Sequence, residues 1–107
     1  MIEFKTGITP EAVEFVRDNI ERIGKLIRIT HERDIGDVYY KTTFIGTKDT
    51  MIVLGGLSSG FDGSGPNALY QLLVELGVPE DEAKREIYDS KENSSWFEIE
   101  MKLCLDS

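Results

Sequence analysis

The segment Gly55–Gly65, with the sequence GGLSSGFDGSG, constrains the fold more than any other part of this chain. It holds five glycines and three serines, and such a density of glycine is unfavourable inside a helix or a strand. The segment is therefore expected to be a loop. It follows the short apolar run Met51–Leu54 and precedes a leucine-rich stretch that begins at Pro66. The sequence thus predicts a strand, a glycine loop and a helix in the middle of the chain.

Hydrophobic periodicity predicts the other elements. Thr9-Pro10-Glu11 indicates the start of a helix, with Thr9 as the capping residue, and Gly24 indicates its end. A strand or an extended arm is predicted at 1–6, and strands are predicted at 25–30, 38–45 and 51–54 and finally at 97–105. Two further helices are predicted at 66–76 and 79–88. The first helix presents one apolar stripe formed by Val13, Val16, Ile20, Ile23 and Ile27.

The predicted elements follow the order β-α-β-β-β-α-α-β. Short turns separate the three central strands, which favours an antiparallel meander. A length of 107 residues is typical of one domain. We therefore predict a single α+β domain over 1–107, with a mainly antiparallel sheet and helices packed on one of its faces.

Composition narrows the partners and the compartment. The chain has 20 acidic and 12 basic residues and a net charge of −8, which disfavours binding to nucleic acid. No apolar run approaches the length that a membrane span requires. A single His31 and a single Cys104 cannot supply a zinc site, and no calcium-loop spacing occurs, so we expect no metal and no cofactor. The lone cysteine and the opening MIEFKTG, which lacks signal-peptide character, indicate the cytoplasm.

The glycine loop has the setting of an anion site. A strand, a glycine loop and a helix N-terminus direct free amides and the positive end of the helix dipole toward one point. Phe61 offers a ring for stacking on a base, and Asp62 can accept a hydrogen bond from a ribose hydroxyl. The loop has no lysine or arginine, so positive charge has to come from the predicted meander, through Lys25, Arg28, Arg33 or Lys41. The predicted ligand-binding residues are Ser58, Ser59, Gly60, Phe61, Asp62, Gly63, Ser64, Gly65 and Arg28.

Three enzyme or nucleotide motifs overlap the loop, and each fails in its context. The Walker pattern lacks the lysine that should follow Gly65. The stretch 63–68 matches G-x-G-x-x-A, but no predicted parallel strand ending in an acidic residue follows it. The stretch 56–60 matches G-x-S-x-G, but no helix follows at once and the only histidine precedes the serine. These failures favour a binding protein without catalysis.

His31 is the one candidate for acid–base chemistry. It lies at a predicted strand end, in a charged stretch with Asp34 and Asp37 nearby. Two roles fit this position: a solvated loop histidine, or an acid–base group that works with one of these aspartates.

Two functions follow from the sequence. The first is a small non-enzymatic binding protein that holds a phosphorylated or nucleotide-like ligand at 55–65 and the helix N-terminus beyond. The second is an acidic interaction module or inhibitor, of a kind that phages or mobile elements carry, in which the surface 80–100 meets a basic protein partner and Trp96 is the anchor. Residues 75–107 hold ten acidic and four basic residues.

A flexible connection is the alternative for the glycine loop, and an exposed edge strand could pair two copies into a homodimer.

Overall fold

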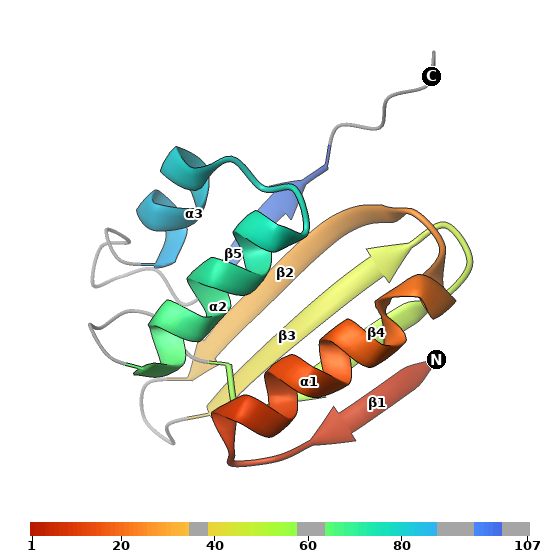
Figure 1. Cartoon of the computed structure of the whole chain (residues 1–107), viewed down its shortest axis with the longest axis horizontal. Helices are drawn as coiled ribbons and strands as arrows, with labels where there is room; N and C mark the ends of the chain where they lie inside the picture. The colour runs from red at the N-terminus through yellow and green to blue at the C-terminus, as the bar shows by residue number, and fades with distance from the viewer. Residues whose placement is uncertain (35–38, 58–63, 88–95, 102–107) are drawn as a thin grey trace.

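The computed structural model describes residues 1–34, 39–57, 64–87 and 96–101. In this part of the chain, five strands form one mixed sheet in the order β1-β4-β3-β2-β5, and the helices lie on one side of it (Figure 1). The predicted α+β class and order of elements are confirmed. The strands are β1 (Ile2–Lys5), β2 (Leu26–Asp34), β3 (Tyr39–Gly46), β4 (Thr50–Leu54) and β5 (Trp96–Glu100), and the helices are α1 (Thr9–Asn19), the 3₁₀ helix η1 (Ile20–Ile23), α2 (Ser64–Glu75) and α3 (Glu80–Ile87).

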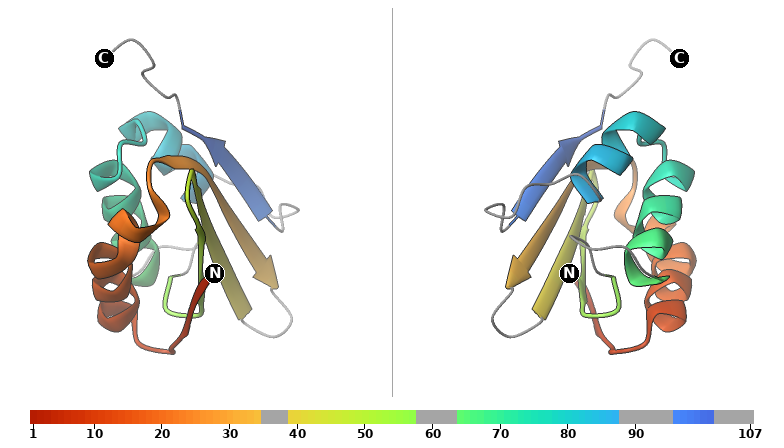
Figure 2. Two further views of the ribbon diagram at one scale, coloured as in Figure 1. Left: turned by 90° about the vertical axis from the view of Figure 1, so that its right-hand side faces the viewer. Right: turned by 90° about the vertical axis from the view of Figure 1, so that its left-hand side faces the viewer.

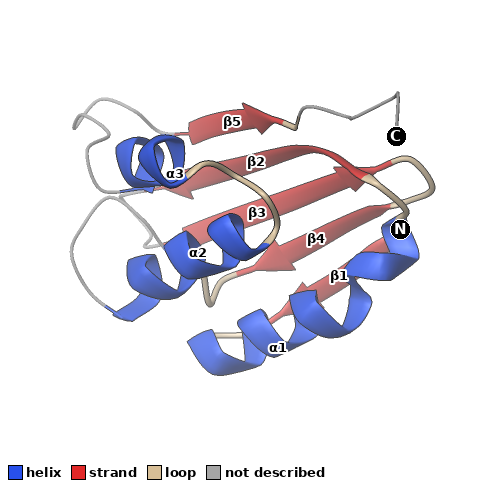
Figure 3. Cartoon of the chain, turned by 45° about the horizontal axis from the view of Figure 1, so that its top comes forward, coloured by secondary structure: helices blue, strands red, loops and turns tan. Residues whose placement is uncertain are grey.

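Strand pairing is mainly antiparallel, as predicted. Strands β2, β3 and β4 form the expected meander, and β5 pairs with the outer side of β2. Strand β1 instead runs parallel to β4, with Phe4 opposite Val53. Each of these two strands leads into a helix on the same face, so α1 and α2 lie side by side and point the same way (Figures 1 and 3).

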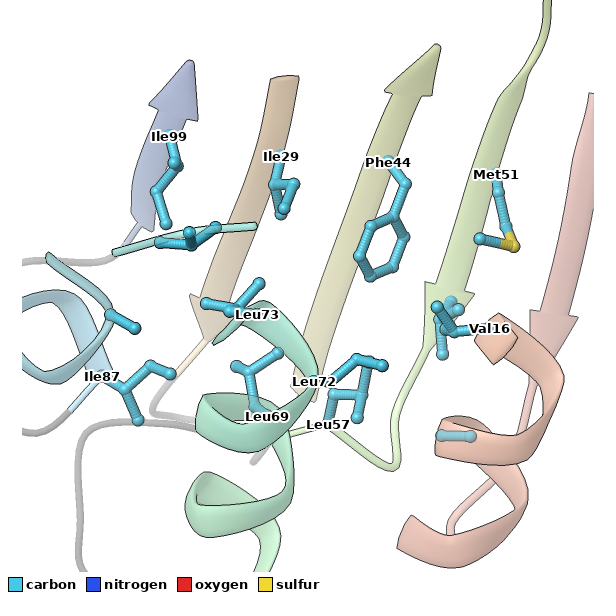
Figure 4. Close-up of a cluster of buried hydrophobic side chains, with 14 of the residues drawn as sticks. Val16, Ile29, Phe44, Met51, Leu57, Leu69, Leu72, Leu73, Ile87 and Ile99 are labelled. Atoms are coloured by element: carbon cyan, nitrogen blue, oxygen red, sulfur yellow. The ribbon is translucent and has the colours of Figure 1, made fainter. Parts of the chain in front are cut away.

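The core lies between the sheet and this helix layer (Figure 2). Ile29, Phe44, Met51 and Ile99 occupy matching register positions on four neighbouring strands, and all are buried (Figure 4). Burial of such side chains stabilises the fold by about 1.5–3 kcal/mol each. The buried hydrophobic side chains from the helices are Ala12, Val16, Ile23, Leu69, Leu72, Leu73, Ala83 and Ile87.

The first helix differs from its predicted form at both ends. Ile8 is the N-cap residue and makes no side-chain capping bond, so the predicted capping role of Thr9 is wrong. The hydroxyl of Thr9 donates instead to the carbonyl of Gly56, at 2.7 Å. At the other end, the helix tightens into η1 before Gly24, which closes it with φ of +82° as expected. Ile27, the last residue of the predicted stripe, belongs to β2.

The turn between β3 and β4 lies at the end of β4 opposite to the glycine loop. Asp49 accepts a hydrogen bond from the backbone N–H of Thr50 at 2.7 Å, and its carboxylate lies 3.1 Å from the amino group of Met1. The backbone bond and then the amino group hold the pKa of Asp49 below its usual value. The exposed Lys48 belongs to the same turn.

His31 lies in the core, so its predicted role as a solvated loop histidine is wrong. The acid–base role stays a prediction, because Asp37 and the side chain of Asp34 lie outside the described residues. Strand β2 continues to Asp34, which places His31 inside the strand and on the face toward the helices. Its ring is buried, its Nδ1 atom lies 2.8 Å from the hydroxyl of Thr42, and the ring stacks at 5.8 Å on Tyr40. Buried polar groups need such partners because an unmade hydrogen bond in the core is costly.

We predict that Thr42→Val lowers the free energy of unfolding by about 1–3 kcal/mol, because the imidazole loses its hydroxyl partner in the core. Thr43→Val is the matched control, since Thr43 alternates to the face without helices and is only partly buried. It should change stability by less than about 0.5 kcal/mol. Urea unfolding of both variants makes the comparison, and equal effects would contradict this role of Thr42.

Candidate functional site

The predicted glycine loop starts where β4 ends and leads to α2. Gly55, Gly56 and Leu57 belong to the described part, and Ser64 and Gly65 open α2. The predicted order of strand, loop and helix is therefore confirmed at both flanks. Six of the predicted ligand-binding residues lie outside the described residues: Ser58, Ser59, Gly60, Phe61, Asp62 and Gly63.

The first two glycines are required by the backbone. Gly55 and Gly56 have φ of +80° and +77°, a conformation that residues with a Cβ rarely adopt. A Cβ on Gly55 would collide with the carbonyl oxygen of Thr6, and one on Gly56 would lie 2.6 Å from the Cβ of Ala12. These two glycines allow the end of β4 to pass directly against the connection between β1 and α1.

Hydrogen bonds hold the end of β4 on both sides. The N–H of Gly55 donates to the carbonyl of Tyr40 in β3, at 2.8 Å. On the other side, the N–H of Thr6 donates to the carbonyl of Leu54, at 3.0 Å. The glycine loop therefore leaves from a fixed point at the carboxyl ends of two parallel strands, the edge at which open sheets of parallel strands bind ligands.

Two helix N-termini point toward this edge, and they differ in charge. At α1, Thr6 accepts a hydrogen bond from the N–H of Ile8 at 3.1 Å and donates to the carboxylate of Glu11 at 2.7 Å. The N-terminus of α1 thus has its own acidic side chain. The first turn of α2 has no acidic residue. Of the two helix ends, α2 is the one that can receive an anion.

Two lysines flank the last residue of β4. Lys5 of β1 and Lys41 of β3 both stand opposite Leu54 in the sheet register, one strand spacing away on each side, and both alternate to the face without helices. Lys41 lies 4.0 Å from Glu32, a weak ion pair. The sequence analysis named Lys41 but missed Lys5, because the parallel pairing of β1 with β4 has no local signal.

Arg28 is not brought to this edge. It lies near the start of β2, opposite Ile45, at the end of the sheet away from Gly55, and it alternates with the buried Ile29. Its Nε atom lies 3.4 Å from the carboxylate of Glu98 in β5. The structure therefore separates Arg28 from Ser64 and Gly65, the other predicted site residues in the described part.

A groove of about 590 Å³ lies between α1 and α2. At the C-terminal ends of both helices, Arg17 and Glu75 form an ion pair of 2.9 Å across it. At the N-terminal ends, the bond between Thr9 and Gly56 places the groove beside the start of the glycine loop. The described residues that line the groove are Thr9, Pro10, Val13, Glu14, Arg17, Asp18, Ala68 and Gln71.

Acidic residues of the segment 80–100 lie on two faces of the molecule. Glu80 and Asp81 are exposed on α3, in the helix layer. Glu98 is exposed too, but it alternates with the buried Ile99 and therefore lies on the opposite face, as the predicted alternation of this strand requires. Trp96 stands opposite Glu32 in the register.

Charge divides between the two layers. The helices α1, η1, α2 and α3 contain nine acidic and four basic residues, whereas the five strands contain five acidic and four basic ones. The helix layer thus carries a net charge of −5 and the strands carry −1. A basic macromolecule would be attracted to the helix layer more strongly than to the sheet.

Comparison of the chain with known protein families, curated proteins and solved structures finds no match. Among the described residues, no three His, Cys, Asp or Glu side chains come together as metal ligands. No helix in the described ranges has both the length and the apolar character that crossing a membrane requires.

We predict that Gly55→Ala lowers the free energy of unfolding by more than about 2 kcal/mol, because the positive φ and the carbonyl of Thr6 both oppose a Cβ. Gly7→Ala is the control, since no atom lies within 4 Å of its Cβ position. It should leave stability unchanged or raise it by up to about 1 kcal/mol. Similar losses in both variants, measured by thermal unfolding, would contradict the contact.

Proposed function

We propose that this protein is a non-enzymatic binding module that holds a small phosphorylated or nucleotide-like ligand at the end of β4. The observation that carries the proposal is the pair of parallel units β1–α1 and β4–α2, whose strands end at one edge of the sheet and are joined there by the bond from Thr9 to Gly56. The ligand's anionic group would bind at the N-terminus of α2, where backbone N–H groups and the helix dipole favour negative charge.

Charge around this edge supports an anion at α2. The first turn of α2 is free of acidic side chains. Lys5 and Lys41 add positive charge at the same end of the sheet, on the face without helices. The loop itself adds serine hydroxyls and the ring of Phe61, which suit a sugar phosphate with a base.

A thermal-shift screen against linear and cyclic nucleotides and phosphometabolites tests this proposal. A ligand at 100 times its dissociation constant should stabilise the fold by about 2.7 kcal/mol, which is several degrees for a domain of this size. Gly63→Val and the double variant Lys5→Gln/Lys41→Gln should each reduce the shift strongly.

Lys48→Gln is the charge control for that screen, because Lys48 lies in the turn at the other end of β4. It should keep the full shift. A flat screen at millimolar ligand would contradict the proposal, as would a shift that the Lys48 variant loses as readily as the Lys5/Lys41 variant.

We propose as a second function that the chain is an acidic interaction module for a basic protein partner. The net charge of −5 in the helix layer favours it, and that layer, instead of one continuous surface over 80–100, would face the partner. Oppositely charged surfaces raise association rates and select partners.

Charge reversal on each face tests the second function, with fluorescent hexalysine at low salt as the probe. Glu14→Lys/Glu80→Lys, one change on α1 and one on α3, should weaken binding several-fold. Glu3→Lys/Glu98→Lys makes the same change in net charge on the strands and should alter binding by less than about twofold. Binding is measured by fluorescence anisotropy titration. If the strand variant weakens hexalysine binding more than the helix variant does, the basic partner binds the sheet and the proposal is wrong.

A further inference from the structure

The groove between α1 and α2 combines an apolar floor with an acidic rim. Pro10 and Val13 of α1 and Ala68 of α2 give it apolar surface, and its volume of about 590 Å³ lies in the range of sites that bind ligands in proteins. Its lining comes from the two parallel helices α1 and α2.

Two carboxylates determine the charge of this groove. Glu14 and Asp18 are exposed and stand four residues apart on α1, so they are neighbours on one helix face, a spacing that places Cβ atoms about 6 Å apart. Arg17 also lines the groove, but its ion pair with Glu75 neutralises it. In the described part of the chain, Glu14 and Asp18 make no ion pair of their own. The groove therefore presents a net charge of −2 to an incoming group.

We propose that this groove docks a basic amphipathic segment of a partner protein. Lysine or arginine side chains have a long aliphatic stem and a charged head, which matches an apolar floor with carboxylates at the rim. Two cations one helical turn apart on the partner would reach Glu14 and Asp18, while apolar residues between them would contact Val13 and Ala68.

The charge of the surrounding helix layer also favours a basic segment. Acidic residues outnumber basic ones nine to four over the helices, so a segment of net positive charge is attracted to this face and an anionic one is repelled. This inference rests on the second proposed function and adds the place and the pattern of recognition.

The test uses the full chain labelled with ¹⁵N and a synthetic helical peptide as the probe. The peptide has lysines one turn apart with leucines between them on the same face, and a control peptide has glutamates in place of the lysines. Addition of the lysine peptide should shift the amide signals of Val13, Glu14, Asp18, Ala68 and Gln71, and the glutamate peptide should shift none of them. Glu14→Lys/Asp18→Lys should weaken binding of the lysine peptide more than tenfold.

Glu80→Lys/Asp81→Lys is the matched control, because it changes the net charge equally on α3 without touching the groove. It should weaken binding by less than about threefold, the effect of the general field. Equal loss in the two double variants, signal shifts on the strands, or no binding of the lysine peptide would overturn the inference. Spermidine that shifts the same signals at an equal dissociation constant would overturn it too, in favour of a small-molecule site.

Failure of this inference and failure of the second function are distinguishable. If hexalysine prefers the helix layer but the amphipathic peptide leaves the groove signals unshifted, the groove is not the docking site and the acidic face still is. If neither probe binds, both proposals fail together.

Discussion

The close approach of Gly55 and Gly56 to the connection between β1 and α1 determines how the units β1–α1 and β4–α2 pack together. A Cβ on Gly55 would collide with the carbonyl oxygen of Thr6, one on Gly56 would collide with the Cβ of Ala12, and both glycines have a positive φ. The contact extends the parallel pairing of β1 and β4 beyond the strands, through the bond from Thr9 to Gly56. It places α1 beside α2. The N-termini of both helices therefore lie at the same edge of the sheet, and a groove forms between the two helices.

Burial on one face of the sheet separates the charges of the protein. The helices cover one face and carry nine acidic and four basic side chains, whereas the strands are nearly balanced in charge. Lys5 and Lys41 lie at the end of β4, and Glu14 and Asp18 line the groove between the helices. The two proposed functions therefore use neighbouring but electrostatically opposite surfaces, an anion site at the loop and a cation-binding groove beside it.

Local patterns predicted most of the elements, because each pattern reports which side of an element is buried. The alternation around Ile99 and the leucine spacing of α2 both correspond to burial against the other layer. The fate of His31 could not be predicted, because it depends on the length of β2 and on the hydroxyl of Thr42 in the next strand. The predicted cap of α1 was wrong for a related reason, because the hydrogen-bond partner of Thr9 lies 47 residues away.

The candidate site was predicted only in part. The glycine loop and the start of α2 have strong local signals, and Gly55 and Gly56 indeed stand where the backbone bends and another backbone approaches. Arg28 was assigned to the site by its charge alone, whereas the register places Lys5 and Lys41 beside Leu54. Such neighbours follow from strand order, and the pairing of β1 with β4 joins segments about fifty residues apart, beyond the reach of a local pattern.

The most direct measurement of the central claim is an NMR titration of the ¹⁵N-labelled chain with inorganic phosphate, followed through the amide signals. If the end of β4 and the first turn of α2 form an anion site, the largest shifts will be those of Gly55, Gly65 and Asn67, with smaller shifts at Lys5 and Lys41. Uniformly small shifts, or shifts centred on Arg28 at the other end of the sheet, would contradict the account.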